Sequence, residues 1–104
     1  MSRFDIYRNP VRSEAGDIPF LLDVQSDFLE MLDTRMIIPL RRADRFRHVM
    51  EHLNPTITHD RRELVVDTAS MASVPRAELK RPVGNIAALR QDIETALDFL
   101  YTGI

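Results

Sequence analysis

The residues best suited to chemistry in this sequence are two histidines and a glutamate in the stretch "HVMEH" at residues 48–52. The order H-x-x-E-H occurs in one class of zinc peptidases. On a helix, histidines four positions apart share a face and could bind zinc while the glutamate polarises a water. His59 or Glu63 could supply a third ligand. Because such a short pattern recurs by chance, and a small chain leaves little room for a substrate cleft, we favour two histidines on a polar surface.

Other arrangements with catalytic potential are weaker. Asp23 and Asp27 could perform acid–base chemistry only in a desolvated pocket, and no sequence feature indicates one. Ser70 and Ser73 lack the G-x-S-x-G context of a nucleophile and an assignable histidine base. The sequence contains neither a P-loop nor a dinucleotide-binding fingerprint. It therefore predicts no catalytic residue, no metal site and no cofactor.

Length and composition limit the class of protein. A chain of 104 residues with 44% hydrophobic and 29% charged residues predicts one globular domain over residues 1–104, with one modest core. The absence of cysteine excludes disulfides and thiolate metal sites. No apolar stretch approaches the ~18 residues that a membrane span needs, and the N-terminus lacks a signal-peptide core. We therefore expect a soluble, cytoplasmic protein with no membrane partner.

The net charge of −2 is unevenly distributed along the chain. Residues 1–34 hold three arginines and seven acids, a net charge of −4, whereas residues 35–62 hold seven arginines and three acids, a net charge of +4. Duplex-binding proteins usually carry a net basic surface, so we expect no direct, specific binding of nucleic acid. The middle segment is either a surface for an acidic protein partner or a solvated arginine-rich loop.

Alternating hydrophobic residues predict several short antiparallel strands. In "RFDIYRN", Phe4 and Ile6 fall on one face. In "FLLDVQSD", every second residue should point inward (Phe20, Leu22 and Val24), and the residues between them should point outward (Leu21, Asp23 and Gln25).

Two further strand regions follow. Residues 35–40 are rich in β-branched residues, and Pro39 indicates an edge or a strand end, because proline removes a donor from the hydrogen-bond ladder. Residues 56–66 predict a hairpin with a polar turn, and residues 70–84 predict mainly turns.

Helical spacing occurs in two segments. In residues 42–53, apolar residues recur at intervals of three and four until Asn54-Pro55, and helix, strand and loop all stay open for this segment. Near the C-terminus, Asn85 could cap a helix whose buried stripe comprises Ile86, Leu89, Ile93, Leu97 and Leu100. The predicted fold is therefore mainly β with one C-terminal α-helix, a small antiparallel barrel capped by that helix.

The end of the chain, "ALDFLYTGI", is unusually apolar. The predicted helical stripe accounts for Leu97 and Leu100 but leaves Phe99, Tyr101 and Ile104 off the buried line. Exposed apolar residues on a small protein usually mark an interaction surface.

Four short motifs in a fixed order give the sequence a family resemblance. They are "LLDVQSD" at residues 21–27, "TRMIIPL" at residues 34–40, "MASVP" at residues 71–75, and a terminal "GI" after the helix. None is specific alone, but together they resemble the CcdB toxin family from Arg3 to Ile104. The resemblance implies an SH3-like barrel that forms a homodimer and acts as the toxin of a type II toxin–antitoxin pair. Such toxins bind the A subunit of DNA gyrase, trap its cleaved-DNA complex without catalysis, and are neutralised by a CcdA-like antitoxin.

The resemblance also implies a gyrase-binding surface. Phe28 and Leu29 occupy the positions of an apolar pair after "QSD", and the remaining positions lie near the end of the chain: Asp98, Tyr101, Thr102, Gly103 and Ile104. Two of these depart from the family pattern, since Asp98 replaces an asparagine and Thr102 replaces a tryptophan. Loss of a tryptophan anchor typically costs about 2–4 kcal/mol of binding free energy.

Two alternative functions stay open. The departures at Asp98 and Thr102 suit a CcdB-like protein that binds antitoxin but has lost or changed its target. A Kid/MazF-like ribonuclease would use the related barrel of those toxins, with the arginine cluster and His48 holding phosphate and donating a proton. Disordered antitoxin tails are usually acidic, so we instead assign the cluster to antitoxin binding: Arg41, Arg42, Arg45 and Arg47.

Overall fold

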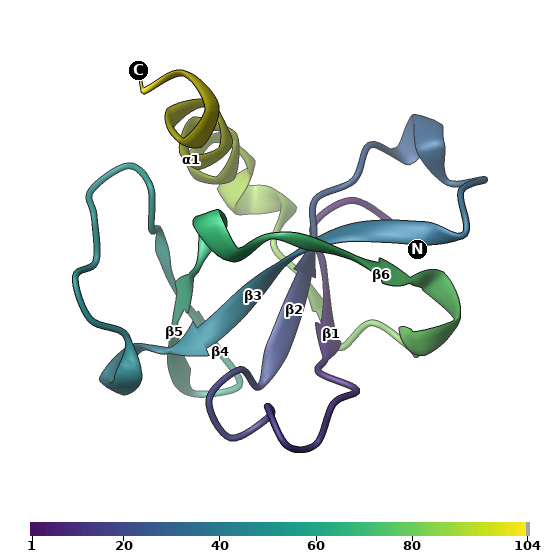
Figure 1. The fold of residues 1–104 in the computed structure, drawn as a ribbon, viewed down its shortest axis with the longest axis horizontal. Helices are drawn as coiled ribbons and strands as arrows, with labels where there is room; N and C mark the ends of the chain where they lie inside the picture. The colour runs from purple at the N-terminus through teal and green to yellow at the C-terminus, as the bar shows by residue number, and fades with distance from the viewer. Residues whose placement is uncertain (104) are drawn as a thin grey trace.

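An antiparallel sheet that curves into a half-barrel dominates the computed structural model, which describes residues 1–103 (Figure 1). Its central strands are β1 (Asp5–Arg8), β2 (Phe20–Asp23) and β3 (Thr34–Arg42). The remaining strands are β4 (Thr56–His59), β5 (Arg62–Val66), β6 (Ala72–Pro75) and β7 (Gly84–Asn85). The strand order is β4-β5-β3-β2-β1-β7, with β6 also paired to β3. Helix α1 (Arg90–Thr102) follows β7. The predicted mainly-β fold with one C-terminal helix is confirmed.

Short 3₁₀ turns connect these elements. They are η1 (Asp27–Leu29), η2 (Ala43–Arg45), η3 (Thr68–Ser70), η4 (Arg76–Glu78) and η5 (Ala87–Leu89). Within residues 1–103, no helix has the length and apolar character needed to cross a bilayer.

The main core lies between the concave sheet and α1. Alternate residues of β1 and β2 point into it, including Ile6 and Leu22, as the alternating pattern predicts. Ile93 of α1 closes the core from the other side and is fully buried. The predicted inward positions Phe20, Leu22 and Val24 all belong to this cluster.

The opposite face of β1 and β2 is also covered, which corrects one prediction. Leu21, Asp23 and Gln25 were expected to face outward, but all three are buried. A second apolar cluster there contains Tyr7, Leu21, Ile37 and Leu79, with Ile18 and Val74 packed against it. The segment from β6 through η4 supplies part of this cover, because it folds back over β3. The sequence predicted only turns between residues 70 and 84 and so missed strand β6.

The prediction that Pro39 marks an edge or a strand end is wrong. Pro39 lies inside β3, opposite Leu21 of the neighbouring strand β2. On its other side, β3 pairs with β6 over Thr34–Ile37 and with β5 over Leu40–Arg42. Pro39 falls where β3 changes partner, so its missing N–H removes no bond from either ladder.

The predicted hairpin over residues 56–66 is confirmed as β4 and β5. Its turn residues Asp60 and Arg61 both have positive φ, at 52° and 62°. Positive φ at both turn residues is typical of a two-residue hairpin turn, because the twist of such a turn matches the twist of the flanking strands.

The helical spacing in residues 42–53 does not produce a helix. Only η2 is regular there, and His48 and His52 have positive φ values of 61° and 70°. Such residues cannot continue a right-handed helix. The C-terminal helix is confirmed, but it begins at Arg90, later than Asn85. Asn85 lies in β7, and its side-chain oxygen accepts a hydrogen bond from Ala87 N, the first residue of η5, at 2.9 Å.

Candidate functional site

The most exposed large apolar side chains lie in the connection between β2 and β3, which we call the apolar loop (residues 26–33). Phe28 is 92% exposed and Met31 is 79% exposed, and Leu29 and Leu32 are also exposed. Ser26 begins η1, and its side-chain oxygen accepts a hydrogen bond from Phe28 N at 3.2 Å. The loop therefore presents an unburied aromatic ring on a hydrogen-bonded turn. Contiguous exposed apolar groups of this kind are uncommon outside interaction surfaces.

The end of α1 carries the second group of predicted target-binding residues. Tyr101 is 73% exposed, and Asp98, Thr102 and Gly103 are exposed as well. The Thr102 hydroxyl donates to the Asp98 carbonyl at 2.7 Å, and Gly103 ends the helix with a φ of 73°. This left-handed C-cap favours glycine. Ile104 lies outside the described residues.

The two groups are separate within one chain. Figure 1 shows the end of α1 at the upper left of the view and the connection from β2 to β3 at the upper right, well apart from each other. Arg3 connects the start of the apolar loop to the first turns of α1. Its backbone N donates to Asp27 Oδ1 at 2.9 Å, and its Nη1 donates to Glu94 Oε1 at 3.2 Å. Glu94 also accepts from Arg90, which is the main reason that the pKa of Glu94 is lowered.

The four arginines assigned to antitoxin binding have different environments. Arg41 is held by two carboxylates, with 2.6 Å between Arg41 Nη1 and Asp17 Oδ2 and 2.6 Å between Arg41 Nε and Asp67 Oδ2. The hydrogen bond to Asp67 is the largest contribution to the raised pKa of Arg41. Its charge is thus compensated, and it is poorly available to a phosphate or an acidic peptide.

The other three arginines are more accessible. Arg42 forms an ion pair with Asp44, with 2.6 Å between Nη2 and Oδ2. Arg45 and Arg47 are exposed, and no ion pair holds either of them within the described residues. The structure therefore divides the predicted cluster into Arg41 and Arg42, which are paired with carboxylates, and the exposed Arg45 and Arg47.

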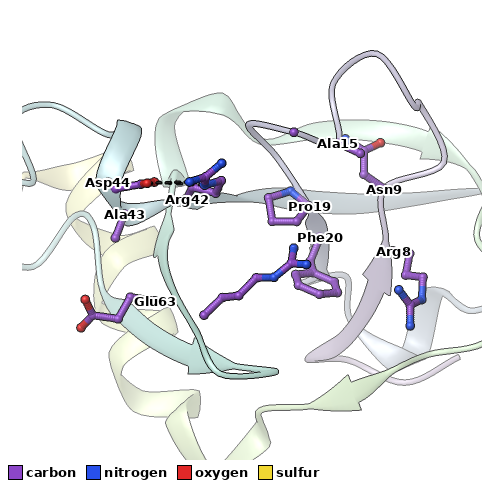
Figure 2. A pocket seen from close by; sticks show the side chains of 11 residues that line it. Arg8, Asn9, Ala15, Pro19, Phe20, Arg42, Ala43, Asp44 and Glu63 are labelled. Carbon is purple, nitrogen blue, oxygen red and sulfur yellow. Dashed lines mark hydrogen bonds and ion pairs between the residues drawn. The ribbon is translucent and has the colours of Figure 1, made fainter.

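Arg42 also lines an open groove of about 870 Å³. Figure 2 shows Arg8 and Arg42 on opposite sides of Pro19 and Phe20. Arg62 also lines the groove, and its Cζ lies 5.9 Å from the centre of the Phe20 ring. Asp44, which pairs with Arg42, and Glu63 line the groove as well, so its three arginines exceed its acids by one. We call this feature the basic groove, defined by Arg8, Arg42 and Arg62. Arg8 and Arg62 could not be grouped with Arg42 from the sequence, because only the pairing of β1, β2, β3 and β5 brings them together.

The candidate zinc ligands are not assembled. The backbone of residues 48–52 is irregular, so its two histidines do not share a helical face. His59 packs edge-on against Phe20 with 4.9 Å between ring centres. Among residues 1–103, no group of three or more histidine, aspartate or glutamate side chains could hold a metal ion.

The fold places the chain among small, mainly-β proteins with one C-terminal helix, and its apolar loop is exposed. The family model described as CcdB protein matches residues 3–103 of the chain. The chain belongs to the CcdB family, as its motifs predicted. It is therefore a toxin of the toxin–antitoxin kind, with an antitoxin as partner, and toxins of this family act by binding and not by catalysis.

Proposed function

We propose that this toxin poisons DNA gyrase by binding its A subunit and trapping the cleaved-DNA complex. The observation that carries this proposal is the exposure of Phe28, at 92%, in the position that the family resemblance assigns to an apolar target-binding pair. Tyr101 supplies a second exposed aromatic ring, at 73%. Aromatic side chains are the commonest anchors of protein interfaces, and these two have no function in the core.

We also propose that the toxin acts as a symmetric homodimer. Within one chain the apolar loop and the end of α1 lie apart, whereas a second copy could bring equivalent surfaces together across a twofold axis. Sedimentation velocity at micromolar concentration tests this assembly. A strictly monomeric protein at all accessible concentrations would contradict it.

The gyrase proposal is tested with supercoiled plasmid, gyrase from the native host, ATP and increasing amounts of toxin. We expect linear DNA to accumulate with the wild-type protein and to fall at least tenfold with Phe28→Ala, because an aromatic hot spot contributes ~2 kcal/mol or more. Val11→Ala is the matched control, since Val11 is exposed but lies outside both predicted groups. Absence of both linear DNA and binding to the A subunit would refute gyrase as the target.

A second candidate function is a CcdB-family protein with a lost or changed target. Thr102 and Asp98 favour it, because they replace a tryptophan and an asparagine in the family pattern. Thr102→Trp distinguishes the two functions. Recovery of cleavage only in this variant would indicate a silenced gyrase poison, and cleavage by the wild type would show that threonine suffices.

For the antitoxin, we propose a surface that combines the basic groove with the neighbouring Arg45 and Arg47. An acidic, disordered tail would gain charge-assisted contacts there. Arg41 contributes less than expected from the sequence, because Asp17 and Asp67 already neutralise it.

A further inference from the structure

The apolar loop is held in place by two side chains that belong to neither predicted group of target-binding residues. Gln25 precedes the loop and is only 8% exposed. Its Nε2 donates to the carbonyl of Leu29 at 3.1 Å, while its Oε1 accepts from Met36 N at 3.0 Å. One side chain thus ties the middle of the loop to strand β3.

Arg76 holds the loop from the opposite side. Its Nη1 donates to the carbonyl of Glu30, and its backbone N donates to the carbonyl of Asp33 at 2.7 Å. Arg76 begins η4, directly after the strand β6 that pairs with β3. The carbonyls of Leu29 and Glu30 are consecutive in the chain, and each accepts a hydrogen bond from a different side chain, Gln25 and Arg76 respectively.

Gln25 is itself anchored to the buried charges of the sheet. Its backbone N donates to Asp23 Oδ1 at 3.0 Å, and Asp23 Oδ2 accepts from Arg35 Nε at 2.8 Å. Asp23 and Arg35 are fully buried, so the chain of bonds begins in the interior of the protein. The loop that carries Phe28 is thereby connected to the core by side-chain hydrogen bonds, although its own apolar residues face solvent.

We propose that Gln25 and Arg76 are positioning residues that hold the apolar loop in its binding conformation before the target arrives. This inference rests on the proposed function, because it assigns Phe28 to the target interface. Binding through a loop that is already ordered avoids the conformational entropy otherwise lost on association. Neither residue needs to contact the target for this effect.

Amide exchange provides the first test, and it requires no target. Arg76→Ala removes the bond to Glu30, and Arg81→Ala is the matched control, because Arg81 is also an exposed arginine. We expect the hydrogen-bonded amides of Leu29, Glu30 and Leu32 to exchange about three- to tenfold faster in Arg76→Ala, with an unchanged unfolding midpoint. Equal exchange in the two variants would overturn the proposal.

Binding to the purified gyrase A subunit provides the second test. Arg76→Ala should weaken binding about three- to tenfold, and Arg76→Lys should recover most of the loss, since lysine can still donate one hydrogen bond. In a Phe28→Ala background, Arg76→Ala should add less than a twofold effect, because its influence passes through the position of Phe28. An undiminished effect in that background would mean that Arg76 contacts the target directly, which contradicts the proposal.

The two tests separate the failure of this inference from the failure of the gyrase proposal. If the wild-type protein does not bind the A subunit, gyrase is not the target, and amide exchange still decides whether Arg76 orders the loop. Gln25→Met serves as a second variant that removes both Gln25 side-chain bonds at similar volume. It should accelerate exchange of the same amides, and unchanged exchange would again overturn the proposal.

Discussion

At the scale of single residues, the buried pair of Asp23 and Arg35 is the least expected feature. The Arg35 Nε donates to Asp23 Oδ2 at 2.8 Å, and neither side chain is exposed. Burial raises the pKa of Asp23, while the hydrogen bond from Arg35 opposes that rise. Arg35 Nη2 lies 2.6 Å from the same carboxylate oxygen, yet neither Nη1 nor Nη2 makes a well-directed hydrogen bond among the described residues. A buried ion pair of this kind adds little net stability. Removing either charge, however, leaves the other buried without a partner, which is strongly destabilising.

We therefore expect Arg35→Met to lower the free energy of unfolding by about 3–5 kcal/mol at pH 7, because it leaves the carboxylate of Asp23 buried and unpaired. The double variant Asp23→Leu/Arg35→Met should lose less, since it removes both charges. Urea unfolding of the two variants measures the difference. A double variant no more stable than the single one would contradict this account.

Tyr7 predicts how stability depends on alkaline pH. Burial, followed by the nearby charges of Asp5 and Asp23, raises the pKa of Tyr7 to about 12. An unfolded tyrosine has a pKa of about 10, so the folded state holds the proton more tightly. The stability contributed by this difference is complete below pH 10 and is lost as the pH rises toward 12. We expect a fall of about 2–3 kcal/mol in the free energy of unfolding over this window.

The comparison variant is Tyr7→Phe, which cannot ionise and should lack that part of the alkaline fall. Urea titrations at several pH values between 9 and 12 give both curves. Parallel curves for the two proteins would show that Tyr7 is not responsible.

At the scale of elements, α1 has one face that stabilises the fold and an end that is free to bind. Ile93 is fully buried in the main core, whereas Tyr101 is 73% exposed two turns later. We expect Ile93→Ala to lower the free energy of unfolding by about 2–5 kcal/mol, through lost burial and a cavity. Tyr101→Ala should change it by less than about 0.5 kcal/mol. Thermal and urea unfolding test both, and a large loss in Tyr101→Ala would contradict a purely functional role.

Some elements were predictable from the sequence and others were not. The hairpin of β4 and β5 and the helix α1 were predictable, because β-branched residues on both sides of a polar turn and regular steps of three and four reflect local geometry. Strand β6 was not, because its partner β3 lies more than thirty positions earlier in the chain. For the segment with His48 and His52, the sequence left helix, strand and loop open, and the positive φ values of both histidines exclude the helix.

At the scale of the whole molecule, the fold brings together charged residues that lie far apart in the sequence. Arg8, Arg42 and Arg62 come from three strands and meet in the basic groove. We expect Arg8→Glu to weaken binding of the acidic antitoxin about tenfold at low salt and less at high salt, because salt screens exposed charges. Arg81→Glu is the control for net charge. Affinity in Arg8→Glu that matches the control at every salt concentration would exclude the groove from the antitoxin surface.

The sequence by itself determined the family, the mainly-β fold with its C-terminal helix, and the apolar character of residues 28, 29 and 101, since motifs and periodicity are local properties of the chain. Only the tertiary structure decided which of those residues stay exposed and which arginines remain uncompensated. It also placed Asp23 and Gln25 inside the protein, because burial depends on what packs over a strand from distant parts of the chain. The support of the apolar loop by Arg76 belongs to this second group, since Arg76 and Glu30 lie 46 positions apart in the chain.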